Sequence, residues 1–244
     1  GVRVWHIERS IDAFIIHYES AGVSISLNCR CLVIATGARE YVQPIPGWTL
    51  PGVVGMAGAT SIFKQDLIPM GSKMVVSGTG PLAFFVAAEQ QRLGGKVAAV
   101  LTSNTFLDWM KALPAMILRP GLLFRGLRWI TALYVNRIPI YWGHTVTRVE
   151  GESSVSRVEF KKIGKDWSPQ GEPSFIDCDC VSLGGGLISA FESFQLAGIS
   201  LEHRRDLGGW IPKAEQDGRT NVGGCFVCGD GAGIRGSLAA QTHG

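Results

Sequence analysis

The chain has 244 residues, a length that suits one large domain or two small ones. Hydrophobic residues make up 46% and charged residues 18%, which excludes disorder, and a net charge of +3 is too small to indicate nucleic-acid binding. The 32 glycines lack the three-residue period of collagen, so their density predicts tight turns against ligands and a parallel sheet buried on both faces.

The N-terminal segments alternate apolar and polar residues, which predicts half-exposed antiparallel strands at 2–8, 12–18 and 22–27. The apolar run 31–37 follows and ends in small residues, which is typical of a buried parallel strand. Residues 41–58 contain several prolines and glycines, and we expect them to form a connector.

The middle of the chain alternates apolar strands with helices. A strand at 73–77 leads into an Ala-rich helix at 82–93, and the next strand is expected at 96–101. Residues 106–135 predict two amphipathic helices that separate near Pro120. The apolar stripe expected on the second of them comprises Leu123, Leu127, Ile130 and Tyr134.

The remainder of the chain predicts mostly strands. They are expected at 138–142, 146–149, 155–161 and 175–183. Residues 223–234 then predict a strand that runs into a loop and the start of a helix.

A glycine pattern, Gly78-x-Gly80-x-x-Ala83, joins the predicted strand 73–77 to the predicted helix. In that context the first glycine makes the tight turn, the second lets the backbone approach a pyrophosphate, and Ala83 lets helix pack on strand. Pro81 and Leu82 open the helix, whose N-terminal amides favour a phosphate group. The pattern predicts a nucleotide site, while an ordinary strand–helix turn remains the alternative.

The usual companion of this pattern is missing. An acidic residue about 20 positions on would bind the ribose, but the next strand ends in Thr102-Ser103-Asn104 and no arginine stands there for a 2′-phosphate. Any of these three side chains could hydrogen-bond ribose hydroxyls. NAD, NADP or another adenine nucleotide therefore all remain open at the Gly78 loop.

Two further motifs occur with this loop. One is ATGARE at 35–40, followed by PIPGWTLPGV at 44–53, and the other is CFVCGDGAGIRG at 225–236. In this order and spacing the set resembles the FAD- and NAD(P)-binding pyridine nucleotide-disulfide oxidoreductases. Within that superfamily it is most similar to the α-type subunits of opine oxidase, hydrogen cyanide synthase and the heteromeric proline or hydroxyproline dehydrogenases.

The resemblance implies FAD held between two segments of one domain, and a second nucleotide in the other domain. The residues that it assigns to FAD are Ala35, Thr36, Gly37, Ala38, Gly229 and Asp230. Those that it assigns to the second nucleotide are Gly78, Gly80, Pro81 and Leu82, with Gly185 and Gly186 at the mouth of that site. It also implies a hetero-oligomer, in which a partner subunit oxidises a small amine or imino acid and this subunit handles electrons.

The expected fold is α/β, with two Rossmann-like three-layer (β-β-α) dinucleotide-binding domains, the second inserted in the first. The FAD domain is expected at 1–47 and 187–244, and the nucleotide domain at 51–186. The N-terminal FAD fingerprint of the resembled family is absent and the sequence stops within the helix after Asp230, so we expect a fragment of a longer protein.

The six cysteines form three close pairs, 29/31, 178/180 and 225/228. Cys225 and Cys228 fall on a predicted strand, about 10 Å apart, too far for a disulfide. The other pairs could offer zinc ligands but lie on separate strands, so buried structural cysteines are favoured over a metal site. The five histidines show neither ligand spacing nor a triad pattern, and no residue is assigned to catalysis.

The predicted helices of 106–135 and the residues just after them carry several cations and a single acid, Asp108. A solvated face is the favoured interpretation, with an acidic partner or membrane headgroups as the alternative. Trp109, Trp129 and Trp142, if exposed, would favour a subunit interface. The cations are Lys111, Arg119, Arg125, Arg128 and Arg137.

No signal peptide is visible, and the longest uncharged run, 41–63, is too rich in proline and glycine for a membrane helix. The cytoplasm is the default location, with a peripheral position at the inner membrane as the alternative. The favoured function is the electron-handling subunit of an FAD-dependent amine or imino-acid dehydrogenase or oxidase. The alternatives are a stand-alone NAD(P)H-dependent reductase of a ferredoxin or disulfide, and a nucleotide-binding scaffold without redox activity.

Overall fold

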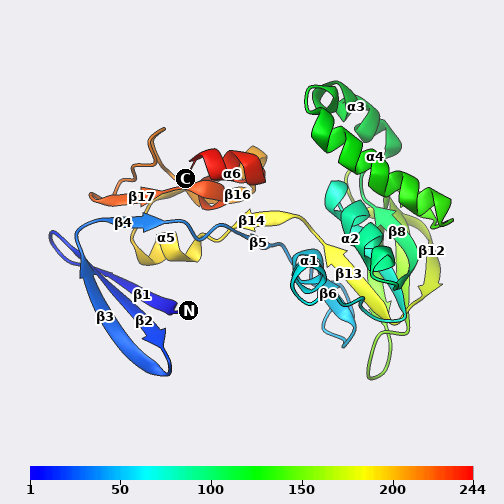
Figure 1. Ribbon diagram of the computed structural model, residues 1–244, viewed down its shortest axis with the longest axis horizontal. Coiled ribbons are helices and arrows are strands. Elements are labelled where there is room, and N and C mark those ends of the chain that lie inside the picture. Colours follow the sequence, from blue (N-terminus) through cyan, green and yellow to red (C-terminus); the bar gives the residue numbers. More distant parts are fainter. Residues whose placement is uncertain (244) are drawn as a thin grey trace. The chain divides into compact units, whose positions relative to one another are not determined.

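The computed structural model describes residues 1–243 and divides them into two compact units. Unit 1 comprises 1–39 and 187–243, and unit 2 comprises 40–186, so the chain passes between the units twice (Figure 1).

Unit 2 is built on a five-stranded parallel sheet in the order β6-β13-β7-β8-β9. Its strands are β6 (Val53–Gly55), β7 (Lys73–Gly78), β8 (Lys96–Thr102), β9 (Ile140–Trp142) and β13 (Cys180–Gly184). Strand β7, helix α2 (Pro81–Arg92) and strand β8 form a βαβ unit, as predicted, with Pro81 in the first helical turn.

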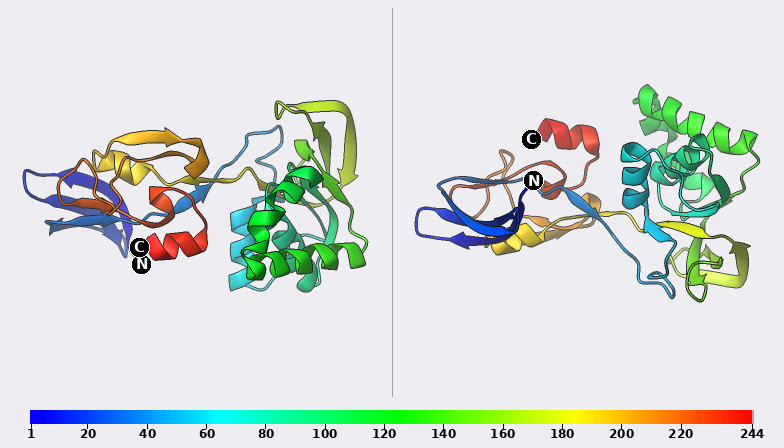
Figure 2. Two further views of the ribbon diagram at one scale, coloured as in Figure 1. Left: turned by 90° about the horizontal axis from the view of Figure 1, so that it is seen from above. Right: turned by 60° about the horizontal axis from the view of Figure 1, so that its bottom comes forward.

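Helices cover one face of this sheet and an antiparallel sheet covers the other (Figures 1 and 2). On the helical face, α1 (Met56–Gln65), α2 and α4 (Pro120–Val135) contribute Phe63, Phe84 and Leu133 to one buried cluster. On the other face, β10 (His144–Glu150), β11 (Arg157–Ile163) and β12 (Pro169–Asp177) pack Val158 and Phe160 against Val75 and Leu101. Unit 2 therefore has the three layers that the sequence predicts.

Two boundaries in unit 2 differ from the sequence prediction. The strand expected at 175–183 is two strands, because Asp179 turns the chain from β12 to β13. Its carboxylate accepts the backbone amides of Ser72 and Lys73 at 2.8 and 2.7 Å. The connector expected at 41–58 already contains β6 and the first turn of α1.

The segment 106–135 forms a helical hairpin, α3 (Phe106–Ile117) and α4, whose second helix packs on α2. The buried side of α4 is Gly126 and Leu133 with Leu123 and Ile130 beside them, while Leu127 and Tyr134 are exposed. The predicted stripe was thus wrong at two positions. The three tryptophans were also not exposed, since Trp109, Trp129 and Trp142 pack against the core. In residues 1–243 no helix combines the length and apolarity that crossing a membrane requires.

Unit 1 contains the predicted antiparallel meander, in the order β1-β2-β3. Its strands are β1 (Arg3–Arg9), β2 (Phe14–Ser20) and β3 (Val23–Cys29). The remaining strands pair two by two: β4 (Leu32–Ile34) with β17 (Cys225–Val227), β5 (Ala38–Glu40) with β14 (Leu187–Ser189), and β15 (Leu201–Arg204) with β16 (Gly209–Pro212). The helices are α5 (Glu192–Leu196), α6 (Ser237–His243) and two 3₁₀ turns, η1 (Arg205–Leu207) and η2 (Gly229–Ala232).

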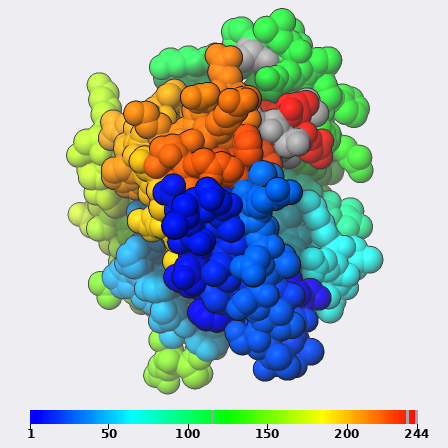
Figure 3. Space-filling view, turned by 90° about the vertical axis from the view of Figure 1, so that its left-hand side faces the viewer, coloured from blue at the N-terminus to red at the C-terminus, as the bar shows by residue number. Residues whose placement is uncertain are grey.

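The core of unit 1 joins the meander to segments from the far end of the chain. Phe14 and Ile16 of β2 are buried with Phe194 of α5 and with Val222 and Val227. In the space-filling view the N-terminal strands (blue) lie beside the segment that leads to β17 (orange) (Figure 3). This packing sets β17, and the loop that follows it, next to β4 in parallel register.

Candidate functional site

A cavity of about 640 Å³ opens in unit 2 at the carboxyl ends of the parallel strands. Strands β6, β13 and β7 are adjacent, and each of them ends on a glycine: Gly55, Gly184 and Gly78. All three glycines line the cavity, together with Gly185 and Ser103. Parallel sheets bind ligands at this edge, and the volume suits a small molecule or cofactor.

The absence of side chains at this edge is a packing requirement. A Cβ at Gly78 would lie 2.7 Å from the carbonyl oxygen of Gly184, and a Cβ at Gly184 would lie 2.6 Å from the sulfur of Met56. Gly80 has a φ of +69°, a left-handed conformation that favours glycine. The loop therefore presents bare backbone to the mouth of the sheet, as the glycine pattern predicts.

Asn104 holds the glycine loop from the next strand. Its side-chain oxygen accepts the backbone amide of Gly80 at 2.9 Å, and the backbone amide of Ser103 donates to the carbonyl oxygen of Gly78 at 3.1 Å. Of the three ribose-binding candidates, Ser103 lines the cavity, the side chain of Asn104 is hydrogen-bonded to the glycine loop, and Thr102 is fully buried. Ser103 is thus the candidate best placed for a ligand.

Glu40 is the charged side chain among the residues that line this cavity in the described part of the chain. Its two carboxylate oxygens each lie 3.2 Å from the backbone amide of Ala57, so it caps the N-terminus of α1, where Gly55 has no side chain to do so. Burial raises the pKa of the Glu40 carboxyl, and hydrogen bonds from the amides of Ala57 and Met56 oppose the shift.

The raised pKa of Glu40 predicts a pH-dependent contribution to stability. The folded chain holds this proton more tightly than the unfolded chain, so the contribution is full below the ordinary carboxyl pKa of about 4.3 and is lost as the pH rises through the folded pKa. The stability of the native chain relative to Glu40→Gln should therefore fall with rising pH. Urea unfolding of both proteins between about pH 4 and pH 8 measures this. Glu152→Gln, which removes an exposed carboxylate, is the control. If the native chain became more stable relative to Glu40→Gln as the pH rises, the assignment would be contradicted.

In unit 1 the two segments of the predicted FAD site lie together. Gly231 packs against Gly37, since a Cβ on Gly231 would lie 3.4 Å from the backbone nitrogen of Gly37. The Ser189 hydroxyl donates to the carbonyl oxygen of Gly231 at 2.7 Å and fixes this approach. One carboxylate oxygen of Asp230 is buried without a hydrogen-bond partner in the structure. A buried acceptor without a donor is what a site for ribityl or ribose hydroxyls requires, so these residues fit the cofactor.

The other residues predicted for FAD lie around this point. Ala35 and Thr36 are exposed beyond the end of β4, and the Thr36 hydroxyl donates to the carbonyl oxygen of Ala190 at 3.2 Å. Gly37 and Gly229 have φ values of +70° and +68°, so both need the freedom of glycine. Ala38 begins β5.

Of the residues predicted for the second nucleotide, Gly78 and Gly185 line the unit 2 cavity. Gly80 is the N-cap of α2, followed by Pro81 and Leu82 in its first turn. Gly186, with a φ of +111°, lies between β13 and β14 and is the last residue of unit 2.

Sequence reasoning missed several lining residues of this cavity. Besides Glu40, they are Trp48, Thr145, Thr147 and Trp167. Thr145, Thr147 and Trp167 come from the antiparallel layer, β10 and the turn between β11 and β12, and no local signal ties that layer to the glycine loop. The ATGARE motif did contain Glu40, but its place at the start of α1 could not be predicted while α1 was taken as a connector.

All six cysteines are free thiols. Burial raises the pKa of Cys178 to about 12 and of Cys180 to about 11, and it also raises the pKa of Cys225, so these thiols stay protonated and unreactive. Cys31 is exposed, which corrects the expectation of a buried residue there. Among the side chains that the structure describes, no group of three or more His, Cys, Asp or Glu residues comes together.

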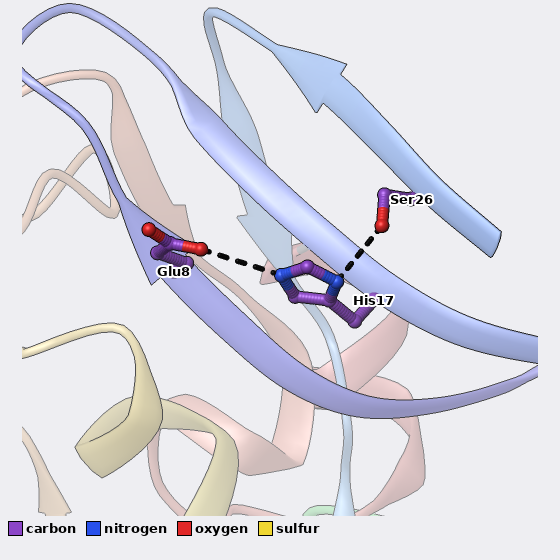
Figure 4. Close-up of polar contacts among 3 residues, drawn as sticks. All are labelled: Glu8, His17 and Ser26. Carbon is purple, nitrogen blue, oxygen red and sulfur yellow. Dashed lines mark hydrogen bonds and ion pairs between the residues drawn. The ribbon is translucent and has the colours of Figure 1, made fainter. Parts of the chain in front are cut away.

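The meander carries a row of side chains in the order of a nucleophile–base–acid triad. The Ser26 hydroxyl lies 2.9 Å from Nδ1 of His17, and a Glu8 carboxylate oxygen lies 3.4 Å from its Nε2 (Figure 4). Ser26 and His17 are direct cross-strand partners, and Ser26 and Glu8 are exposed. None of the three side chains lines the unit 2 cavity or the small pocket beside Gly229 and Arg235 in unit 1. The row is a cross-strand contact that stabilises the sheet.

Curated proteins with similar sequences include subunits of a hydrogen cyanide synthase and of an opine oxidase. Hydrogen cyanide synthase subunit HcnB of Pseudomonas protegens is 30% identical over 87% of this chain and 45% of its own length. An opine oxidase subunit of Agrobacterium tumefaciens is 30% identical over 92% of this chain and 43% of its own length. The chain therefore spans less than half the length of these relatives.

Solved structures share the fold at lower identity. L-proline dehydrogenase from P. horikoshii superposes with a TM-score of 0.65 at 19% identity, over 96% of this chain and 36% of that one. Thioredoxin reductase from T. acidophilum gives 0.68 at 18% identity, over 98% of this chain and 69% of that one. The chain thus has the mixed α/β fold of these structures.

The sequence model of one family matches residues 2–244, which is nearly the whole chain. That match agrees with the glycine-ended sheet of unit 2 and with the paired glycines and buried carboxylate of unit 1. The chain belongs to the pyridine nucleotide-disulphide oxidoreductase family.

Proposed function

We propose that the chain is part of the electron-handling subunit of an FAD-dependent amine or imino-acid dehydrogenase or oxidase, acting with a catalytic partner subunit. The observation that carries the proposal is that one chain contains two candidate binding sites. Unit 1 has a buried Asp230 oxygen without a hydrogen-bond partner, and unit 2 has a cavity lined by strand-end glycines. The similarity to HcnB and to the opine oxidase subunit supports the type of enzyme.

The residues of the two sites supply binding and orientation. FAD, when bound, would supply the hydride and electron chemistry. Asp230 would accept hydrogen bonds from hydroxyls of the cofactor, and Gly37 and Gly231 would let the backbone lie against it. In unit 2, Gly78 and the N-terminus of α2 would receive phosphate groups.

The cavity of unit 2 favours a nucleotide without a 2′-phosphate. Its charged lining residue in the described chain is the acid Glu40, so the extra phosphate of NADPH would meet no cation there. We expect NADH or ADP to bind about tenfold or more tightly than NADPH. Quenching of tryptophan fluorescence measures this directly, because Trp48 and Trp167 line the cavity. Equal or tighter binding of NADPH would overturn the preference.

The experiment that tests the proposed function is the reduction of the bound flavin. Bleaching of a yellow protein by an amino acid or opine, only when a partner subunit is present, supports the dehydrogenase. Bleaching by NADH alone would favour a reductase, a possibility raised by 25% identity to the ferredoxin–NADP reductase of Symbiobacterium thermophilum. A colourless protein that binds adenine nucleotides would instead identify a scaffold without redox activity.

A further inference from the structure

The α3–α4 hairpin presents a wide apolar surface that the rest of unit 2 leaves uncovered. On α3, Phe106, Met110 and Ile117 recur at helical spacing and are more than half exposed. At the tip between the helices Leu118 is 83% exposed, and on α4 Phe124 is 72% exposed. We call this surface the hairpin face. Its other exposed apolar members are Leu107, Leu122, Leu127, Tyr134 and Val135.

Cations accompany these apolar side chains. Arg119 lies at the tip, Arg125 and Arg128 lie one turn apart on α4, and Lys111 and Arg137 complete the set. Within the described residues none of the five forms an ion pair. The single acid of the segment, Asp108, is held in the capping box at the start of α3, where it accepts the amide and hydroxyl of Thr105.

We propose that the hairpin face docks on an anionic lipid surface. Leu118 and Phe124 would enter the boundary between headgroups and acyl chains, while Arg119, Arg125 and Arg128 would remain at the level of the lipid phosphates. The inference is independent of the proposed function, since it uses none of the residues of either site.

Two observations favour lipid over a protein partner. The cations are interspersed with the exposed apolar side chains along both helices, which matches a plane of anionic headgroups above an apolar layer. Arg119 directly follows Leu118, the most exposed apolar residue of the hairpin, so a cation and an apolar side chain lie together at the tip, as amphipathic helices on anionic lipid have them. The acids that would balance these cations must therefore come from the docking surface.

Co-sedimentation with vesicles tests the proposal. The protein should bind vesicles of phosphatidylcholine mixed with phosphatidylglycerol, bind poorly to phosphatidylcholine alone, and dissociate at high salt. Arg125→Glu with Arg128→Glu, and separately Leu118→Ser with Phe124→Ser, should each weaken partitioning roughly tenfold or more. Arg205→Glu with Lys213→Glu is the matched charge control, and Ile11→Ser, at a residue that is 95% exposed, is the apolar control.

All four substituted hairpin side chains are exposed, so we expect each variant to fold as the native protein does. Thermal unfolding of each variant checks this. Equal binding to both kinds of vesicle, or binding unchanged by the hairpin variants, would overturn the proposal. So would a concentration-dependent dimer that Leu118→Ser with Phe124→Ser abolishes in the absence of lipid, since a second copy would then cover the face.

Discussion

Gly184→Ala is expected to destabilise the chain by about 1–3 kcal/mol, the usual cost of forcing an extra methyl group into a packed core. The new Cβ would lie 2.6 Å from the sulfur of Met56 and 2.9 Å from its Cγ. Met56 is buried at the start of α1, so its side chain must shift within the core to make room. Urea unfolding measures the loss, and nucleotide binding to the cavity that Gly184 lines should weaken with it.

A double-mutant cycle identifies the cause. Met56→Ala alone leaves a cavity and costs about 2–5 kcal/mol, but it also removes the atoms that the Gly184→Ala methyl group would meet. The two losses should therefore be less than additive by about 1 kcal/mol or more. Gly78→Ala should be rescued less by Met56→Ala, because its Cβ also meets the backbone carbonyl of Gly184 at 2.7 Å.

The exposed Gly58 in α1 provides the matched control. A Cβ there would meet only Val54, at an ordinary 3.4 Å, so Gly58→Ala should stabilise the helix by about 0.5–1 kcal/mol. Additive losses for Gly184→Ala and Met56→Ala would show that the edge of the sheet tolerates side chains and that its glycines have another cause.

Features that depend on neighbouring residues were predictable from the sequence. The Gly78 loop, the strand before it and α2 after it form one local unit, and the pattern of turn glycines and apolar runs predicted all three. The meander of unit 1 was predicted for the same reason, from the alternation along its strands. The expected half-burial holds for β2, whereas the apolar residues of β3 are exposed.

Features that depend on distant segments were not predictable. The segment 175–183 reads as one strand, and only the pairing of Asp179 with the amides of Ser72 and Lys73 shows that two strands meet there. The exposed side of α4 was misplaced for a related reason: Leu127 and Tyr134 are apolar, and the sequence does not show that the helix turns them away from α2. Apolar character is a poor guide to burial on a helix that carries an exposed apolar patch, as α4 does.

Replacing Asp230 by Ala is expected to move flavin binding and intrinsic stability in opposite directions. The carboxylate oxygen without a partner is an unsatisfied buried acceptor, and its removal should raise the free energy of unfolding of the flavin-free chain by about 1 kcal/mol. The same change removes hydrogen bonds to a charged acceptor, each worth about 1.5–3 kcal/mol, so flavin affinity should fall at least tenfold.

The two readouts separate a ligand-binding role from a structural one. Flavin content and affinity are measured on the purified protein, and urea unfolding is measured on the same protein after the flavin is removed. Asp12→Asn, at an exposed position in the same unit, controls for the loss of a charge. Asp230→Ala could instead lower both the flavin affinity and the free energy of unfolding of the flavin-free protein. The carboxylate would then stabilise the loop between β17 and α6, and its assignment to the cofactor would be wrong. We expect flavin affinity to fall and flavin-free stability to rise, because a carboxylate that binds a ligand destabilises the empty site, where its oxygen lacks a hydrogen-bond donor.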